Sequence, residues 1–170
     1  NCDGFEVCFV DDDSDGYRNT DTSLTVNSSD LDCDDSGEGS TSEPATDCDD
    51  TASSINPGAT EIVADEIDQN CDTDETCYRD SDNDGFRTTD TSLTVNSNDL
   101  DCDDLGEGAS SEPSTDCNDF DPAINPSITE VIDNGVDQDC DGFELCFSDS
   151  DSDGFRSTDT SLTVNSSDLD

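Results

Sequence analysis

Residues 11–17 read DDDSDGY, and the same D-x-D-x-D-G pattern with a following aromatic residue returns as DSDNDGF at 80–86 and DSDSDGF at 149–155. Carboxylates at positions 1, 3 and 5 converge when such a loop curls around a cation, glycine at position 6 allows the sharp turn, and position 7 offers its carbonyl. The pattern predicts three calcium loops that resemble the first half of an EF-hand. Their predicted ligands are Asp11, Asp13, Asp15, Tyr17, Asp80, Asp82, Asp84, Phe86, Asp149, Asp151, Asp153 and Phe155.

Position 12 of each loop departs from the EF-hand pattern, because it holds threonine instead of a bidentate glutamate. An aspartate stands directly before each of these threonines. The closing ligand is therefore predicted to be either that neighbouring aspartate or a residue far away in the sequence. The neighbouring candidates are Asp21, Asp90 and Asp159.

The acidic loops are part of a longer repeat. The whole chain repeats with a period of 69 residues, since Cys2, Cys71 and Cys140 are separated by 69 positions each. The segment TDTSLTVNS recurs unchanged at 20–28, 89–97 and 158–166. We divide the chain into repeat 1 (1–70, with residue 1 assigned to a preceding unit), repeat 2 (71–139) and a partial repeat 3 (140–170). This regularity predicts a piece of a longer tandem array.

A second acidic loop straddles each repeat boundary, with predicted ligands Asp68, Asn70, Asp72, Asp137, Asp139, Asp141 and Phe143. Thr73 stands where the loop pattern expects glycine, which disfavours the required backbone conformation in this copy. Further acidic residues surround Cys48 and Cys117, precede Glu61 and Glu130, and predict another calcium cluster in each repeat. The surrounding residues are Asp47, Asp49, Asp50, Asp116, Asn118 and Asp119. Around Cys33 and Cys102, calcium ligation and a simple acidic surface remain open alternatives.

Composition narrows the class of protein further. The 170 residues carry four arginines against 48 acidic residues, a net charge of −44, which disfavours any nucleic-acid partner. No apolar run is long enough to span a membrane. Ten cysteines with no histidine indicate a disulfide framework in an oxidising compartment, so the chain is expected to be extracellular or on a cell surface.

Apolar residues are too sparse to form a conventional hydrophobic core, so the fold must be held by covalent cross-links or bound metal ions. The expected fold class is a tandem array of small irregular β modules with few short strands and little helix, stapled by disulfides and Ca²⁺. Alternation of Leu24 and Val26 predicts a strand over 23–28, with copies at 92–97 and 161–166. Short helical turns after Pro57 and Pro126 would fit capping by the preceding asparagines.

Residues 46–72 (TDCDDTASSINPGATEIVADEIDQNCD) and 115–142 (TDCNDFDPAINPSITEVIDNGVDQDCDG) resemble the metal-binding repeat of the MopE type of bacterial surface protein. The preceding acidic loops are similar to thrombospondin type 3 repeats. The resemblance implies secreted or surface-attached modules that bind calcium, and the family name carries a copper association. Copper is disfavoured here, because the chain has no His or Met and its cysteines are expected to be oxidised.

The resemblance also implies a cysteine pairing. Its D-C-D…N-C-D ends suggest that Cys48 joins Cys71 and Cys117 joins Cys140, which leaves Cys8 for Cys33 and Cys77 for Cys102. Cys2 and Cys146 then have no partner within the 170 residues. Each bridge would stabilise the fold by on the order of 3 kcal/mol in the chain-entropy model.

Three functional classes compete. The favoured one is an extracellular structural protein, a calcium-stabilised array that forms a filament, stalk or surface fibre through further repeats or self-association. The alternative is a calcium-dependent adhesin or an acidic metal- or mineral-binding matrix protein. An enzyme is not expected, because the acidic sites repeat and no distinctive catalytic constellation accompanies them. The N-x-S sequons at Asn27 and Asn165 allow glycan attachment.

Overall fold

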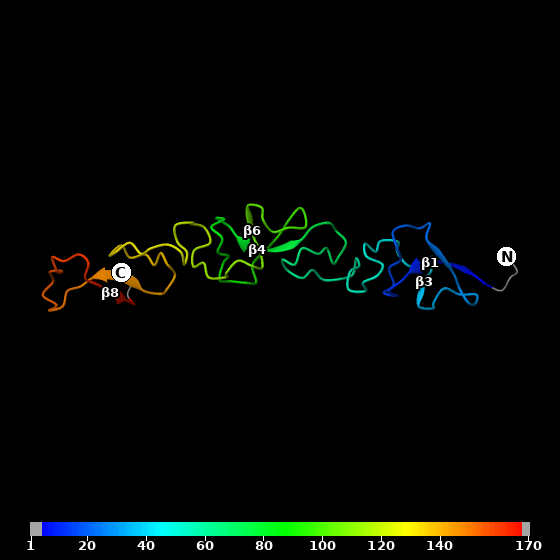
Figure 1. Ribbon diagram of the computed structural model, residues 1–170, viewed down its shortest axis with the longest axis horizontal. Helices are drawn as coiled ribbons and strands as arrows, with labels where there is room; N and C mark the ends of the chain where they lie inside the picture. Colours follow the sequence, from blue (N-terminus) through cyan, green and yellow to red (C-terminus); the bar gives the residue numbers. More distant parts are fainter. Residues whose placement is uncertain (1–4, 168–170) are drawn as a thin grey trace. The chain divides into compact units, whose positions relative to one another are not determined.

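The computed structural model describes residues 5–167 and consists of short antiparallel strands joined by long ordered loops (Figure 1). The strands are β1 (Val7–Asp11), β2 (Thr25–Asn27), β3 (Gly37–Gly39), β4 (Thr76–Asp80), β5 (Thr94–Asn96), β6 (Gly106–Gly108), β7 (Glu144–Phe147) and β8 (Thr163–Ser166). They form sheets with the orders β2-β1-β3, β5-β4-β6 and β7-β8. No helix occurs among residues 5–167, so the predicted class of small β modules is confirmed.

The strands predicted within TDTSLTVNS are present as β2, β5 and β8. In the first sheet β2 pairs with β1 so that Cys8 lies opposite Val26, and β3 pairs with the other edge of β1. The prediction of a helical turn after Pro57 is wrong. The chain instead makes a tight turn, in which the Ala59 N–H donates to the Asn56 carbonyl at 2.9 Å and the Asn56 side chain caps Gly58 N–H at 2.8 Å. Pro126 likewise lies in a turn without helix.

Carboxylates occupy much of the interior that apolar side chains fill in most domains. The buried hydrophobic residues are Cys8, Ala64, Cys77 and Cys102, three of them half-cystines, whereas Asp47, Glu75, Asp80 and Asp116 are among the largest fully buried side chains. Burying unpaired carboxylates in a protein costs several kcal/mol each unless a counter-charge accompanies them. The fold therefore depends on what neutralises its interior.

Four disulfides staple the sheets and loops, in the pairing that the family resemblance implies. They join Cys8 to Cys33, Cys48 to Cys71, Cys77 to Cys102 and Cys117 to Cys140. Among the described residues Cys146 is a free thiol, and Cys2 lies outside them. The first and third bridges tie β1 and β4 to the acidic segments around Cys33 and Cys102, while the other two close the loops matched by that resemblance.

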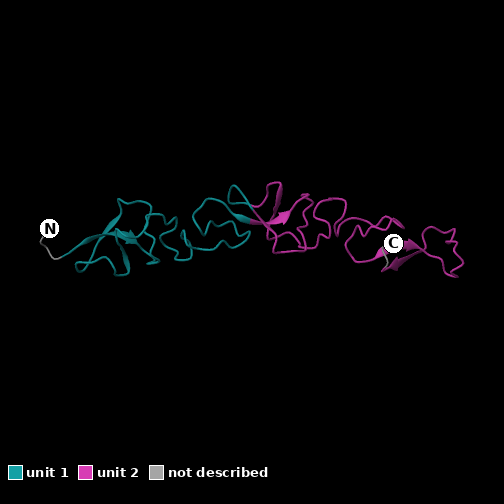
Figure 2. Cartoon of the chain, turned by 180° about the vertical axis from the view of Figure 1, so that it is seen from behind, with its two compact units in different colours: residues 1–76, 96–101 teal, residues 77–95, 102–170 magenta. Residues whose placement is uncertain are grey.

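Two compact units make up the chain, residues 1–76 with 96–101 and residues 77–95 with 102–170 (Figure 2). This division differs from the boundaries of the sequence repeats. Segment 96–101 groups with the first unit because it bonds to Glu75: the Ser97 N–H donates to the Glu75 carbonyl at 2.8 Å, and the Glu75 N–H donates to the Asp99 carbonyl at 2.9 Å. No helix among the described residues could span a membrane.

An isolated parallel bridge in each unit brings a distant segment to the acidic loop. It pairs Asn19 with Asp47 in the first unit and Thr88 with Asp116 in the second. The Arg18 N–H also donates to the Pro44 carbonyl at 3.0 Å. The arginine side chain is held at the same place, because its guanidinium stacks on the Phe9 ring at 4.0 Å and its Nε–H donates to the Glu43 carbonyl at 2.7 Å. The aspartate next to Cys48 is thereby placed against the first acidic loop.

Candidate metal centres

The first acidic loop is ordered by its own aspartates. Asp11, at position 1, accepts hydrogen bonds from the backbone N–H groups of Ser14 at 2.7 Å and Gly16 at 3.2 Å. Asp15, at position 5, accepts from Tyr17 N–H at 2.8 Å. Asp80 and Asp84 make the equivalent bonds in the second loop, to Asn83, Gly85 and Phe86. In both loops, oxygens of the three aspartates lie within 4.8 Å of one another.

The oxygens that these bonds do not use are buried and have no hydrogen-bond partner. In the first loop they are Oδ2 of Asp13 and Oδ2 of Asp15, and in the second they are both carboxylate oxygens of Asp82 and Oδ2 of Asp84. Most buried polar atoms in folded proteins are bonded to another protein group or to an ordered water. The recurrence of these unpartnered oxygens at the same positions of both complete repeats points to a common ligand.

A distant aspartate completes each group. Asp47 is 2% exposed and Asp116 is 1% exposed, and Oδ2 of each is buried without a partner. Burial raises the pKa of Asp47, and the negative charges of Asp15, Asp50 and Asp11 add to the rise. We call the group Asp13, Asp15 and Asp47 the first loop-closure centre, and the group Asp82, Asp84 and Asp116 the second.

The carboxylates at position 3 show how strongly each centre concentrates negative charge. Burial, followed by the charges of Asp15 and Asp47, raises the pKa of Asp13 to about 6. Burial, followed by the charges of Asp84 and Asp116, raises the pKa of Asp82 to about 6. A divalent cation between these oxygens would remove the repulsion, and a group of three carboxylates suits a hard cation that prefers oxygen ligands.

The aspartates expected next to position 12 lie elsewhere. Oδ1 of Asp21 accepts hydrogen bonds from the Ser23 hydroxyl at 2.6 Å and the Ser23 N–H at 3.0 Å, and these bonds lower the pKa of Asp21 on the exposed surface. Asp90 and Asp159 make the same contacts with Ser92 and Ser161. Of the two predicted alternatives, the structure therefore brings the distant residue to each complete loop.

Asp49 was predicted in one cluster with Asp47, but the Asp49 carboxylate does not join the Asp47 carboxylate. Asp49 donates its backbone N–H to Asp47 Oδ1 at 2.9 Å, while its own carboxylate is exposed and accepts from the Thr51 hydroxyl at 2.7 Å. In repeat 2 the same position is Asn118, whose N–H makes the same bond to Asp116 at 2.8 Å. The position thus supplies a backbone donor.

Glu61 lies at the boundary loop and not beside Asp47. Its Oε1 accepts from the Asn70 N–H at 2.8 Å and its Oε2 is buried without a partner. Burial raises the pKa of Glu61, and the charges of Asp68 and Asp72 add to the rise. In repeat 2 oxygens of Glu130, Asp137 and Asp139 lie within 4.8 Å of one another. We call the group of Glu61, Asp68 and Asp72 the first boundary centre and the group of Glu130, Asp137 and Asp139 the second. The second loop also contains Asp141, which accepts the Phe143 N–H at 2.8 Å.

Two glutamates that follow the boundary loops at a constant distance in the sequence, and that could add oxygens to them, are buried in the structure. Glu75 is 1% exposed and Glu144 is 2% exposed. Oε1 of each accepts a backbone N–H, from Ala64 and Asn134 at 3.0 Å, and Oε2 of each is buried without a partner. Their constant distance from the loop in the sequence was the available signal, and their burial is what the structure adds.

The third loop shows what the distant segment contributes. Gly154 N–H donates to Asp149 at 3.0 Å and Phe155 N–H donates to Asp153 at 2.9 Å, so the loop has the same form. No D-C-D-D segment follows it within the 170 residues, and here Asp151 and Asp153 are exposed. The acidic cluster around Cys33 is also exposed at Asp30, Asp32, Asp34 and Asp35. Asp149 Oδ1, at position 1, is nevertheless buried, so the difference from the two complete repeats lies at positions 3 and 5.

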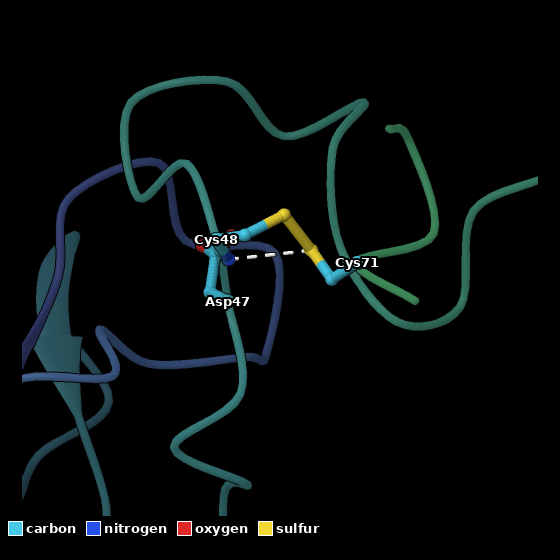
Figure 3. A group of neighbouring side chains, drawn as sticks. All are labelled: Asp47, Cys48 and Cys71. Carbon is cyan, nitrogen blue, oxygen red and sulfur yellow. Dashed lines mark hydrogen bonds between the residues drawn. A yellow bond between two sulfur atoms is a disulfide. The ribbon is translucent and has the colours of Figure 1, made fainter. Parts of the chain in front are cut away.

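Cysteine sulfur does not serve as a thiolate in these groups. Asp47 lies beside Cys48 and Cys71, which are joined in a disulfide, with the Cys48 N–H donating to Cys71 Sγ at 3.3 Å (Figure 3). The second copy, with Asp116, Cys117 and Cys140, is bonded in the same way. All four sulfurs are therefore oxidised, and the donors that remain are carboxylate oxygens.

Thr73 adopts the backbone conformation that glycine occupies in the other copy. Its φ is 75°, against 85° for Gly142, and each N–H donates to the first aspartate of its loop at 2.8 Å. Replacing Thr73 with glycine is expected to raise the free energy of unfolding by about 1 kcal/mol, because a β-branched residue is strained at positive φ. Chemical denaturation of the disulfide-intact chain measures it. Gly142→Thr is the matched control and is expected to lower stability, whereas a loss of stability in Thr73→Gly would contradict this account.

Comparison with known protein families supports a metal-binding role for these segments. The model of the Cu-binding MopE family, described as a putative metal-binding motif, matches residues 47–76 and 116–144. The resemblance inferred from the sequence is thereby confirmed. Each match begins at the aspartate that closes an acidic loop and extends to the buried glutamate behind the boundary loop. No curated protein and no solved structure matches the chain.

Proposed function

From two copies of the MopE-type motif in one chain, we propose that this protein is an extracellular structural protein, a tandem-repeat array whose modules are held together by Ca²⁺. The observation that carries the proposal is the recurrence of buried, unpartnered carboxylate oxygens at the same positions of both complete repeats. A solvated acidic surface would need no such burial. The role is structural and not catalytic, and the array serves as a filament, stalk or surface fibre.

Calcium fits these centres better than copper does. The donors are carboxylates and carbonyls, which suit hard cations, whereas copper prefers imidazole, thioether or thiolate ligands. The chain has no His and no Met, and eight of its cysteines are joined in disulfides. Those disulfides favour an oxidising location outside the cell.

Isothermal titration calorimetry of the disulfide-intact chain tests the proposal. Two centres in each of two complete repeats, four in all, are expected to bind Ca²⁺ with saturation. Cu²⁺ is expected to bind without displacing Ca²⁺ from them. Tighter stoichiometric binding of Cu²⁺ at the same sites, or the absence of saturable Ca²⁺ binding, would overturn the assignment.

Stability should depend on pH in opposite directions with and without calcium. Asp13 and Asp82 have a folded-state pKa raised from 3.8 to about 6, so the metal-free folded chain retains protons that the unfolded chain has lost. This contribution to stability is present below about pH 4 and is lost as the pH rises through 6. Scanning calorimetry of the metal-free chain is expected to show a falling unfolding temperature between pH 4 and pH 7. Saturating Ca²⁺, which binds the deprotonated form, should reverse the trend, and the same slope in both conditions would contradict the shared centres.

A further inference from the structure

Arg79 is the one arginine that departs from the repeat pattern. Three arginines follow the acidic loops at the same position and stack on aromatic rings at 3.8 to 4.0 Å: Arg18 on Phe9, Arg87 on Tyr78 and Arg156 on Phe147. Arg79 stands in β4, where repeat 1 has Val10 and repeat 3 has Ser148, and its guanidinium lies over the Phe120 ring at 5.3 Å. It adds a positive charge to one repeat alone.

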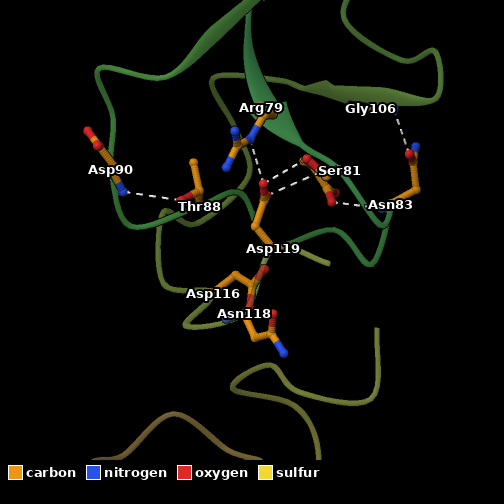
Figure 4. Close-up of polar contacts among 10 residues, drawn as sticks. Arg79, Ser81, Asn83, Thr88, Asp90, Gly106, Asp116, Asn118 and Asp119 are labelled. Atoms are coloured by element: carbon orange, nitrogen blue, oxygen red, sulfur yellow. Dashed lines mark hydrogen bonds and ion pairs between the residues drawn. The ribbon is translucent and has the colours of Figure 1, made fainter. Parts of the chain in front are cut away.

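This charge lies at the edge of the second loop-closure centre. The Arg79 guanidinium contacts Asp119, with Nε 2.6 Å from Oδ2 (Figure 4). The Ser81 hydroxyl donates to the same oxygen at 2.8 Å, and the Ser81 N–H donates to Oδ1 at 3.2 Å. Asp119 is 5% exposed, and both of its oxygens are engaged by protein donors. Ser81 stands between Asp80 and Asp82 in the acidic loop, so these bonds hold Asp119 beside the carboxylates of the centre.

The corresponding aspartate of repeat 1 has no such cation. Asp50 is 7% exposed, and its Oδ2 accepts from the Asn19 amide at 3.2 Å. Its Oδ1 is buried without a hydrogen-bond partner. Asn19, whose amide bonds Asp50, pairs with Asp47 in the parallel bridge, so Asp50 lies beside the first centre. Each centre thus has four buried carboxylate oxygens without a hydrogen-bond partner, but in the first one of them belongs to Asp50, whereas in the second Asp119 contributes none and Arg79 adds a positive charge.

We propose that the two loop-closure centres are not equivalent: the first is a high-affinity calcium site completed by Asp50, and the second is a weaker site in which Arg79 occupies Asp119. This inference rests on the proposed function and adds an order of filling to it. A fixed positive charge several ångströms from a bound divalent cation lowers its affinity by about tenfold or more at the effective dielectric of a protein surface. At intermediate calcium concentrations the first centre is filled and the second is empty.

Tyrosine-sensitised terbium luminescence, with Ca²⁺ as competitor, can report each centre separately. The chain has no Trp, and its two tyrosines are Tyr17, in the first loop, and Tyr78, in β4. Tyr78→Phe leaves a reporter for the first centre alone. A chain with Tyr17→Phe, Tyr78→Phe and Phe86→Tyr carries the reporter at the equivalent position of the second loop. The full chain with intact disulfides is used throughout, and the mass after alkylation verifies the disulfides of every variant.

Half-displacement of Tb³⁺ is expected to need about tenfold less Ca²⁺ at the first centre than at the second. Arg79→Val, which removes the charge while Ser81 still bonds Asp119, should lower the Ca²⁺ concentration needed at the second centre by about tenfold. Arg79→Lys, which keeps the charge, should leave the second centre weak. The reciprocal Val10→Arg should weaken the first centre by about tenfold.

Equal affinities in the two reporter chains, or an unchanged second centre after Arg79→Val, would overturn the inference while leaving calcium binding intact. Absence of Tb³⁺ and Ca²⁺ binding at both centres would overturn the proposed function and the inference together. The two failures are therefore distinguishable. Should Val10→Arg fail to fold, Arg79→Val still decides the question, because Arg79 is 26% exposed and valine is the residue that repeat 1 has at this position.

Discussion

Removal of calcium is expected to lower the unfolding temperature of the disulfide-intact chain by about 20 °C or more. Each compact unit contains one loop-closure centre and one boundary centre. A centre at a hundredfold excess of calcium over its dissociation constant stabilises the folded state by about 2.7 kcal/mol, so two give about 5 kcal/mol. In a unit of this size 1 kcal/mol corresponds to roughly 4–8 °C. Scanning calorimetry with and without a chelator measures the difference.

Monovalent salt is the control for this experiment. A chain with a net charge of −44 would gain some stability from any electrolyte, because salt screens repulsion between exposed carboxylates. Calcium at millimolar concentration is expected to restore the unfolding temperature, while sodium chloride at the same ionic strength should not. Equal recovery in both salts would mean that the acidic loops are a screened surface and contain no binding sites.

Asp47→Asn is expected to weaken calcium binding at the first loop-closure centre by on the order of 100-fold, because it removes a buried ligand charge next to the cation. The substitution keeps the size of the side chain and the position of Cys48. Asp116→Asn should have the same effect at the second centre. Calorimetric titration is expected to show one high-affinity site fewer in the Asp47 variant, with the boundary centres unchanged.

Asp49→Asn is the matched control, because Asp49 flanks the same half-cystine on the other side and loses the same charge. Its exposed carboxylate contacts Thr51, and repeat 2 already has Asn118 at this position. We expect less than a threefold change in affinity, in line with the small effect of exposed charges. Equal losses in the Asp47 and Asp49 variants would show that general acidity, and not a defined centre, binds the cation.

The sequence predicted those features that are local or repeated. The acidic loops form as their spacing indicates, because the first aspartate bonds backbone N–H groups only three to five residues ahead. The strands within TDTSLTVNS follow from alternation of apolar residues. β1 and β3 were not predicted, and β3 has the sequence GEG, which carries no strand propensity. It forms because β1 pairs with it along an otherwise open edge.

Ligand partners far apart in the sequence were harder to assign. Asp21 is near the first loop in the sequence, but its carboxylate folds back onto Ser23, and closure falls to Asp47. The parallel bridge between Asn19 and Asp47 that causes this has no local sequence signal. The prediction that Glu61 lies in one cluster with Asp47 was wrong because it also ignored contacts between distant segments. The chain turns at Asn56, and Glu61 then bonds the boundary loop through the Asn70 N–H. Periodicity locates the ligands, and the pairing between segments assigns them to centres.

Anomalous diffraction from crystals of the disulfide-intact chain loaded with Tb³⁺ tests the central claim most directly, since it locates each cation and its ligands. The account predicts a peak in each complete repeat that is coordinated by loop positions 3 and 5 together with the distant aspartate, Asp13, Asp15 and Asp47 in repeat 1. Peaks bound by the loop without Asp47 and Asp116, or scattered over exposed carboxylates, would contradict it.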